Sequence, residues 1–191
     1  MKRTTLLPCL LTTLALIPAL GFAQVSCTRD GLKAATDLYI EAQTKGDLSG
    51  LPLAAGLGYQ ENIAAADIKT GIVTKPMKID HHRSIFDTES CQTFTEVIVT
   101  DKAAPYVIGT RMRINRDKIA EVETLWTTTG YWLFNADNYL KYSSAENWGP
   151  LAVEDRSARG TLVAAANAYL DAFLEGKKDM GVIALGATNK M

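Results

Sequence analysis

PYVIGTRMRIN (residues 105–115), followed after a tight turn by KIAEVETLWT (118–127), is the stretch that decides the fold. Both segments alternate apolar and polar residues and are rich in β-branched and aromatic side chains, a pattern typical of strands in a half-buried sheet. Between them lie Asn115 and Asp117, which tolerate the left-handed backbone of a hairpin turn. The two segments therefore predict a β-hairpin.

Two more segments of the same kind precede this hairpin, namely MKIDHHRSIFDT (77–88) and CQTFTEVIVT (91–100). They are bounded by the polar residues 88–90 and by the run 101–105, which ends in a proline. Consecutive strands joined by short turns pair antiparallel. The sequence thus predicts one antiparallel sheet made of three successive hairpins.

Residues two apart on a strand point to the same face of a sheet. This rule puts Arg111 and Arg113 on one face of the third strand, and groups Ile119, Glu121 and Glu123 on one face of the fourth. The arginines and glutamates are expected to form cross-strand ion pairs; inside a cavity they would instead hold a carbonyl or carboxylate of a ligand. Both faces mix polar and apolar residues, which favours a sheet around a partly polar cavity.

A helix is predicted before the sheet, over residues 28–45, because apolar residues recur there with helical spacing. Thr28 and Asp30 can cap its start, and Gly46 ends it. The Gly- and Ala-rich segment 46–68 predicts one or two short helical turns over the open end of the sheet.

After the sheet we expect an ordered loop with a helical turn near residues 136–141, and then a second amphipathic helix from residue 159. This helix repeats the first: TLVAAANAYLDAFLEG (161–176) aligns with GLKAATDLYIEAQTKG (31–46) in its Leu, Tyr and terminal Gly. Duplication is our interpretation, and convergence of two Ala-rich helices is the alternative. The helix would then pack loosely or protrude, with a poorly ordered tail over 180–191.

The first residues have the composition of a secretory signal peptide: Lys2 and Arg3, an apolar run, then the small residues Gly21 and Ala23. We therefore divide the chain into a signal peptide (1–23), one domain (24–149), and a linker plus the first helix of a truncated second copy (150–191).

The composition also limits the partners of the chain. It has 191 residues, 47% of them hydrophobic, and a formal net charge of −1. This is typical of a globular domain and lacks the basic excess of a nucleic-acid-binding surface. We predict a secreted protein that binds neither nucleic acid nor, in its mature form, a membrane.

Cysteine usage predicts one disulfide. Cys9 falls in the leader, which leaves Cys27 and Cys91 in an oxidising compartment. A bond between them would tie the start of the first helix to the start of the second strand.

A long helix, short helical turns and a curved antiparallel sheet together resemble the α+β, cone-shaped fold of the nuclear transport factor two-like superfamily, which includes the SnoaL-like cyclases and scytalone dehydratase. More closely, four stretches resemble a family of secreted fungal proteins of unassigned function: GLKAATDLYIEAQTKGD, GYQEN (58–62), MKIDHHRSIFDTESCQTFTEVIV and EVETLWTTTGYWLFNADNYLKY. The resemblance covers residues 27–149 and implies a helix packed on a curved sheet, with a second related domain of which this chain carries one helix. The superfamily hosts enzymes, binding modules and transport factors, so the fold alone does not decide the function.

Asp80, His81 and His82 are the candidate catalytic residues, because they bring both histidines of the chain beside a carboxylate. One histidine would act as acid–base and Asp80 would orient it. Neighbouring strand residues point to opposite faces, so only one of the two can enter a cavity, and the sequence does not choose between them. A solvated strand edge is the alternative. The same geometry lacks the further ligands of a zinc site, so we predict no metal.

Five residues are candidates for substrate binding: Tyr59, Asn62, Arg111, Glu123 and Trp126. The superfamily often places polar groups over the cavity mouth, and this resemblance implies that Tyr59 and Asn62 donate hydrogen bonds there. Trp126 begins an aromatic cluster that would line a site for a flat hydrophobic ligand. Core packing is the alternative for Tyr59 and Trp126.

Two functions follow from these residues. The first is a secreted, cofactor-free cyclase, isomerase or dehydratase that acts on a hydrophobic metabolite by acid–base and shape catalysis. No phosphate-binding glycine loop, dinucleotide fingerprint or nucleophile elbow is present, so no cofactor is predicted. The second is a non-enzymatic ligand-binding or interaction protein of the same fold. A buried His–carboxylate or His–Tyr pair would favour the enzyme, and a homodimer is compatible with either function.

Overall fold

The computed structural model describes residues 25–171 and 173. The signal peptide predicted for residues 1–23 and the tail predicted for 180–191 lie outside this part of the chain. The chain forms two compact units, with the boundary after Ala145. No helix in the described part is long and apolar enough to cross a bilayer.

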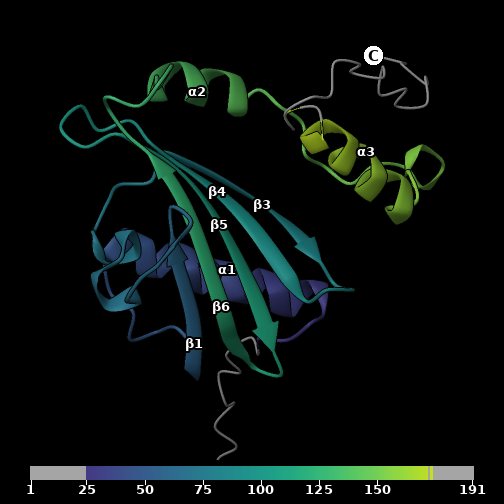
Figure 1. Cartoon of the computed structure of the whole chain (residues 1–191), viewed down its shortest axis with the longest axis horizontal. Helices are drawn as coiled ribbons and strands as arrows, with labels where there is room; N and C mark the ends of the chain where they lie inside the picture. Colours follow the sequence, from purple (N-terminus) through teal and green to yellow (C-terminus); the bar gives the residue numbers. More distant parts are fainter. Residues whose placement is uncertain (1–24, 172, 174–191) are drawn as a thin grey trace, which may run out of the picture. The chain divides into compact units, whose positions relative to one another are not determined.

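The first unit is built on one curved, unclosed sheet with the strand order β2-β1-β6-β5-β4-β3 (Figure 1). Its strands are β1 (Leu53–Glu61), β2 (Ala64–Ala65), β3 (His81–Asp87), β4 (Gln92–Val99), β5 (Tyr106–Asn115) and β6 (Lys118–Thr127). Strands β3 to β6 pair antiparallel in sequence order, which confirms the three predicted hairpins. In the turn between β5 and β6, the residue with a left-handed backbone is Arg116, with φ 58°. The sequence had suggested Asn115 or Asp117 for this conformation.

The segment 46–68 differs from the prediction. Short helical turns were expected, but the middle of the segment forms β1, which pairs parallel with β6. The turns come later, as η1 (Ile68–Thr70) and η2 (Ile72–Thr74). Gly56 and Gly58 give β1 little strand propensity of its own. The unpaired edge of β6 supplies hydrogen-bond partners that override this local preference.

Helix α1 (Arg29–Lys45) has the predicted caps: Thr28 accepts a hydrogen bond from a backbone N–H, and Gly46 ends the helix with φ 67°. Figure 1 shows α1 crossing one face of the sheet. Leu32 and Tyr39 are fully buried between helix and sheet. We call the covered face of the sheet the α1 face.

Hydroxyl groups form a layer inside the α1 face. Tyr39 Oη lies 2.7 Å from Thr110 Oγ1, which lies 3.2 Å from Thr124 Oγ1. Ser84 and Thr95 pair at 3.0 Å on the neighbouring strands. Burial raises the pKa of Tyr39 to about 12, so its hydroxyl stays protonated at neutral pH. These hydroxyls therefore bond to one another within a packed interior, whereas the buried Thr93 Oγ1 has no hydrogen-bond partner in the described residues.

Ile119 also departs from the prediction, because simple alternation groups it with Glu121. The pairing of β5 with β6 shifts register between Arg113 and Ile114, which leaves Ala120 as an extra residue on β6. Such a bulge reverses the faces of the residues before it. Ile119 consequently lies in the hydrophobic core under α1, with no exposed surface.

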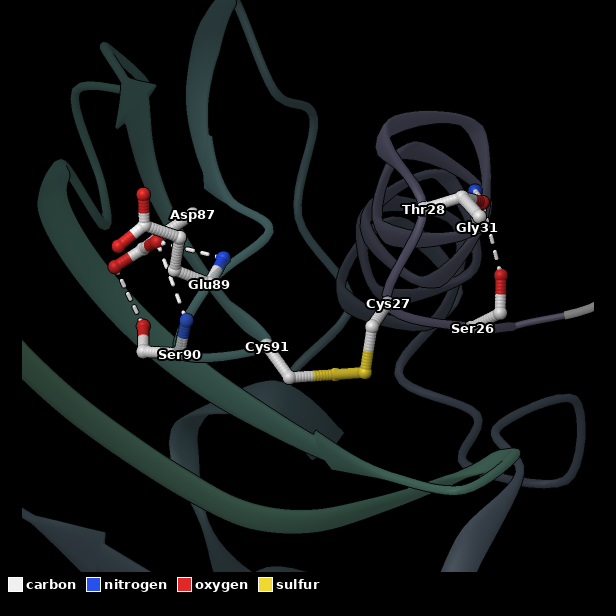
Figure 2. Close-up of a disulfide and its surroundings, with 8 residues drawn as sticks. All are labelled: Ser26, Cys27, Thr28, Gly31, Asp87, Glu89, Ser90 and Cys91. Atoms are coloured by element: carbon white, nitrogen blue, oxygen red, sulfur yellow. Dashed lines mark hydrogen bonds between the residues drawn. A yellow bond between two sulfur atoms is a disulfide. The ribbon is translucent and has the colours of Figure 1, made fainter.

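Cys27 and Cys91 form the predicted disulfide, with their Cα atoms 4.9 Å apart (Figure 2). The bond joins the residue before the N-cap of α1 to the turn before β4, where Cys91 adopts a left-handed φ of 56°. The same turn is held by Asp87, which accepts hydrogen bonds from the backbone of Glu89 and Ser90. On the chain-entropy model a loop of this length stabilises the fold by about 4 kcal/mol.

Two helices follow the sheet. Helix α2 (Ala136–Ser143) confirms the helical turn expected there and belongs to the first unit; its N-cap Asn135 accepts from the backbone of Asn138. Helix α3 (Arg159–Asp171) belongs to the second unit and begins at the predicted residue. That α3 starts a duplicated domain, and that it packs loosely, stay predictions.

Candidate functional site

The face of the sheet opposite α1 carries two adjoining grooves; we call it the open face. The larger groove has a volume of about 490 Å³ and the smaller about 240 Å³. They share four residues, so they form one continuous depression, the open-face groove. The shared residues are Ile63, Phe94, Gly109 and Leu125.

The floor of the groove is apolar and accessible. Phe94 of β4 is 43% exposed and Leu125 of β6 is 56% exposed. Gly109 lies between them on β5, and a Cβ there would come within 3.0 Å of the Phe94 ring. The absence of a side chain at Gly109 therefore allows the ring to lie flat against the sheet.

The turn between β1 and β2 forms one rim. Asn62 and Ile63 both have left-handed backbones, with φ 48° and 71°, as a type I′ hairpin turn requires. Asn suits this conformation, whereas a β-branched residue is strained in it, and Ile63 is also 86% exposed. The Asn62 Oδ1 accepts a hydrogen bond from the backbone N–H of Trp126 at 2.9 Å, which fixes the turn to the end of β6.

The Trp126 ring points to the α1 face, opposite to Leu125, and packs against the core around Ile72 and Ile108. Its indole N–H donates to Glu61 at 2.6 Å, and its ring packs against Tyr106 and Tyr131, with centroids 5.8 and 6.1 Å away. Glu61 also accepts from the Tyr59 hydroxyl at 3.2 Å. Burial and the nearby Glu61 charge raise the pKa of Tyr59. Tyr59 thus lies in the α1 core and supports Trp126 through Glu61.

Glu96 anchors α2 to the other rim. Its carboxylate forms an ion pair with Arg83, whose Nε lies 2.9 Å away and whose Nη2 donates at 3.3 Å. It also accepts hydrogen bonds from two side chains of α2, Tyr139 and Ser143, both at 2.7 Å. Figure 1 shows α2 over one end of the sheet. Sequence reasoning missed this cluster. The available signal was an acidic residue within the apolar run of β4, which calls for a buried partner.

Arg111 and Glu123 line the smaller groove and bind each other. Arg111 Nε donates to Glu123 at 2.8 Å, and its other nitrogens reach Glu121 at 3.0 Å and Gln92 at 3.2 Å. Arg113 also pairs with Glu121. These hydrogen bonds raise the pKa of Arg111 and lower that of Glu121 to about 2. The expected cross-strand ion pairs are confirmed.

The two histidines lie on β3, the edge strand, and neither lines the open-face groove. His82 has the register of Ser84, toward α1, and is exposed; partial burial and the neighbouring His81 lower its pKa, opposed by Asp37. His81 has the opposite register, and its Nε2 is buried without a hydrogen-bond partner in the described part of the chain.

In this structure the Asp80 carboxylate forms hydrogen bonds with Thr100 rather than with either histidine. Its Oδ2 accepts from the backbone N–H and the hydroxyl of Thr100, at 2.7 and 2.8 Å. These hydrogen bonds lower the pKa of Asp80. They fasten the start of β3 to the end of β4, and a catalytic role for Asp80, His81 or His82 stays a prediction.

The structure thus brings together four of the five predicted binding residues and separates them from the predicted catalytic ones. Asn62 and Trp126 line the larger groove, and Arg111 and Glu123 line the smaller. Tyr59 lies beneath them, in the core.

No protein-family model and no curated protein matches the chain. Similar solved structures include an NTF-2-like protein of unknown function from Burkholderia xenovorans LB400, with 12% identity over 63% of this chain and 94% of that one and a TM-score of 0.39. They also include AclR from Streptomyces galilaeus, described provisionally as a hydroxylase, with 13% identity over 73% and 99% of the two chains and a TM-score of 0.38. These are likenesses of fold alone, and they carry no argument about superfamily, ligand or reaction.

Proposed function

We propose that the protein binds a small, flat and largely apolar molecule in the open-face groove. The observation that carries this proposal is the accessible floor of Phe94 and Leu125, with the exposed rings of Tyr131 and Tyr139 also lining the groove. Pockets of a few hundred Å³ with apolar walls and few polar groups are the usual sites for small ligands. Aromatic walls favour a planar ligand.

The charged groups of the groove favour binding over catalysis. A general acid or base must reach the substrate proton with its own hydrogen-bonding atoms. Glu96 is engaged by Arg83 and α2, and Glu123 is engaged by Arg111. These carboxylates act as fixed parts of the wall, so the non-enzymatic function is the better supported of the two.

A matched pair of leucines tests the proposal. Leu125 on the groove floor and Leu162 on α3 are exposed to the same extent, 56% and 57%. Titration with 2-acetylnaphthalene, a neutral planar probe, is followed by saturation-transfer NMR and calorimetry. We expect saturable binding that Leu125→Ser weakens about 5-fold or more through lost apolar contact. Leu162→Ser should leave binding unchanged, and equal effects of the two variants would refute the site.

A second candidate function, a cofactor-free cyclase, isomerase or dehydratase, is supported by one observation. The buried Nε2 of His81 lacks a partner in the described part of the chain, and an unpaired buried nitrogen is costly unless a substrate or water uses it. Once a ligand that reacts is known, His81→Ala should lower its turnover by about 10²–10⁴ while His82→Ala has little effect. Equal, small losses would remove this candidate.

We also propose that the mature chain is secreted. The leader-like composition of residues 1–23 supports this, together with the disulfide between Cys27 and Cys91. Expression of the full chain in a eukaryotic host should yield extracellular protein that begins at Gln24. Retention of an intact N-terminus inside the cell would contradict it.

A further inference from the structure

We infer that the ligand of the open-face groove is uncharged and carries a hydrogen-bond acceptor, a carbonyl or ether oxygen, that meets the side-chain amide of Asn62. This inference rests on the proposed function and narrows it to a class of ligand. It follows from two features of the groove: the fixed orientation of one amide and the pairing of the charges in the walls.

The orientation of the Asn62 amide follows from its hydrogen bond to β6. The backbone N–H of Trp126 can only donate, so the side-chain atom 2.9 Å from it is the carbonyl oxygen Oδ1. The other end of the amide is then the NH2 group, which can only donate. A flip of this amide would turn its NH2 toward the Trp126 N–H, so that two donors face each other, and the hydrogen bond therefore disfavours the flip. A ligand group that pairs with it must therefore be an acceptor.

The charged residues that line the groove in the described chain are Glu96, Arg111 and Glu123. Both oxygens of Glu96 accept hydrogen bonds, from Ser143 on one and Tyr139 on the other. Arg111 donates to Glu123 through Nε and to other partners through both terminal nitrogens. A charged ligand would lose water here and would have to break one of these pairs to find a counter-charge. The groove therefore selects against both anions and cations.

Aromatic side chains line the same groove as Asn62 and orient the ligand. Phe94, Tyr131 and Tyr139 are 43%, 47% and 43% exposed. A planar ring system in contact with them would bring a substituent at its edge toward the Asn62 amide. Because the ligand makes one polar contact in this proposal, with the Asn62 amide, the position of its acceptor sets its orientation in the groove.

Three probes of nearly equal shape test the class of ligand. They are 2-acetylnaphthalene, which offers a neutral acceptor; 2-isopropylnaphthalene, which offers none; and 2-naphthoate, which is an anion at pH 7. Calorimetry on the whole mature chain should show the ketone binding about 3- to 10-fold more tightly than the hydrocarbon, as one net hydrogen bond allows. The ketone should also bind at least about 10-fold more tightly than the carboxylate 2-naphthoate.

Asn62→Asp is the matched variant. Aspartate keeps the oxygen that accepts from Trp126 N–H and tolerates the left-handed turn, but it replaces the donating NH2 with an acceptor. The preference for the ketone over the hydrocarbon should then disappear, and 2-naphthylmethylammonium should gain affinity. Asn115→Asp, at the exposed end of β5, introduces the same charge away from the groove and should change none of these ratios.

The possible outcomes separate this inference from the proposed function. Equal binding of the three probes, or a preference for the ketone that survives Asn62→Asp, overturns the inference, while weakening of every probe by Leu125→Ser still supports the groove as the site. Tighter binding of 2-naphthoate than of the ketone also overturns it. If none of the probes binds saturably, the inference and the proposed function fall together.

Discussion

The two faces of the central sheet use polar and apolar residues in opposite ways. On the α1 face, hydroxyls such as those of Thr110 and Thr124 are buried and bonded to one another and to Tyr39. On the open face, Phe94 and Leu125 are apolar and accessible. Buried polar groups must be paired, whereas accessible apolar groups gain free energy from any ligand that covers them. The comparison locates the binding surface by its exposed apolar residues rather than by its polar ones.

The part of the open face beneath α2 should behave as core. Glu96→Ala leaves Arg83 buried without that carboxylate and removes the acceptor of Tyr139 and Ser143. We expect a loss of about 3–5 kcal/mol in the free energy of unfolding, measured by urea denaturation. Glu123→Ala, in the more exposed ion pair with Arg111, should cost about 1 kcal/mol or less. Similar losses in the two variants would mean that α2 does not bury its part of the sheet.

A second pair of substitutions compares the faces directly. Leu32 is fully buried under α1, whereas Leu125 is 56% exposed. Leu32→Ala should lower the free energy of unfolding by about 3 kcal/mol because it creates a cavity. Leu125→Ala should change it by about 0.5 kcal/mol or less while weakening ligand binding. A large loss of stability from Leu125→Ala would show that the open face is a structural surface.

Removing one hydroxyl from the layer on the α1 face should lower the free energy of unfolding by less than Leu32→Ala does. Tyr39→Phe removes the partner of Thr110 and of Gln43 without removing the ring. We expect a loss of about 1–2 kcal/mol because buried polar atoms are left unpaired. Tyr142→Phe, at a tyrosine that is exposed, is the control and should be neutral. A neutral Tyr39→Phe would indicate that water replaces the hydroxyl.

The smallest expected effect is the acid sensitivity of the ion pairs on the open face. Hydrogen bonds from Arg113 and Arg111 lower the pKa of Glu121 from 4.5 to about 2 in the folded protein. The stability that Glu121 contributes is therefore present above about pH 4.5 and is lost as the pH falls toward about 2. Melting curves between these values should show a shallower pH dependence for Glu121→Gln than for the natural chain. Added salt should reduce the difference, since these side chains are partly exposed.

Local signals explain which parts of the fold could be predicted. The hairpins of β3 to β6 follow from alternation and short turns, and the ends of α1 follow from Thr28 and Gly46. Strand β1 was missed because it depends on parallel pairing with β6, a contact that its own glycines do not suggest. Ile119 was misplaced because a bulge of one residue reverses the alternation.

The sequence by itself determined the residue chemistry of this protein: two cysteines that pair, arginines and glutamates in register across a hairpin, and an aromatic cluster at the end of the last strand. Only the tertiary structure decided which of these residues share a groove. Asn62 meets Trp126 because β1 joins the sheet edge beside β6, and Glu96 is buried because α2 returns over β4. Such contacts join residues far apart in the chain, and their free energy comes from burial and pairing that no local pattern encodes.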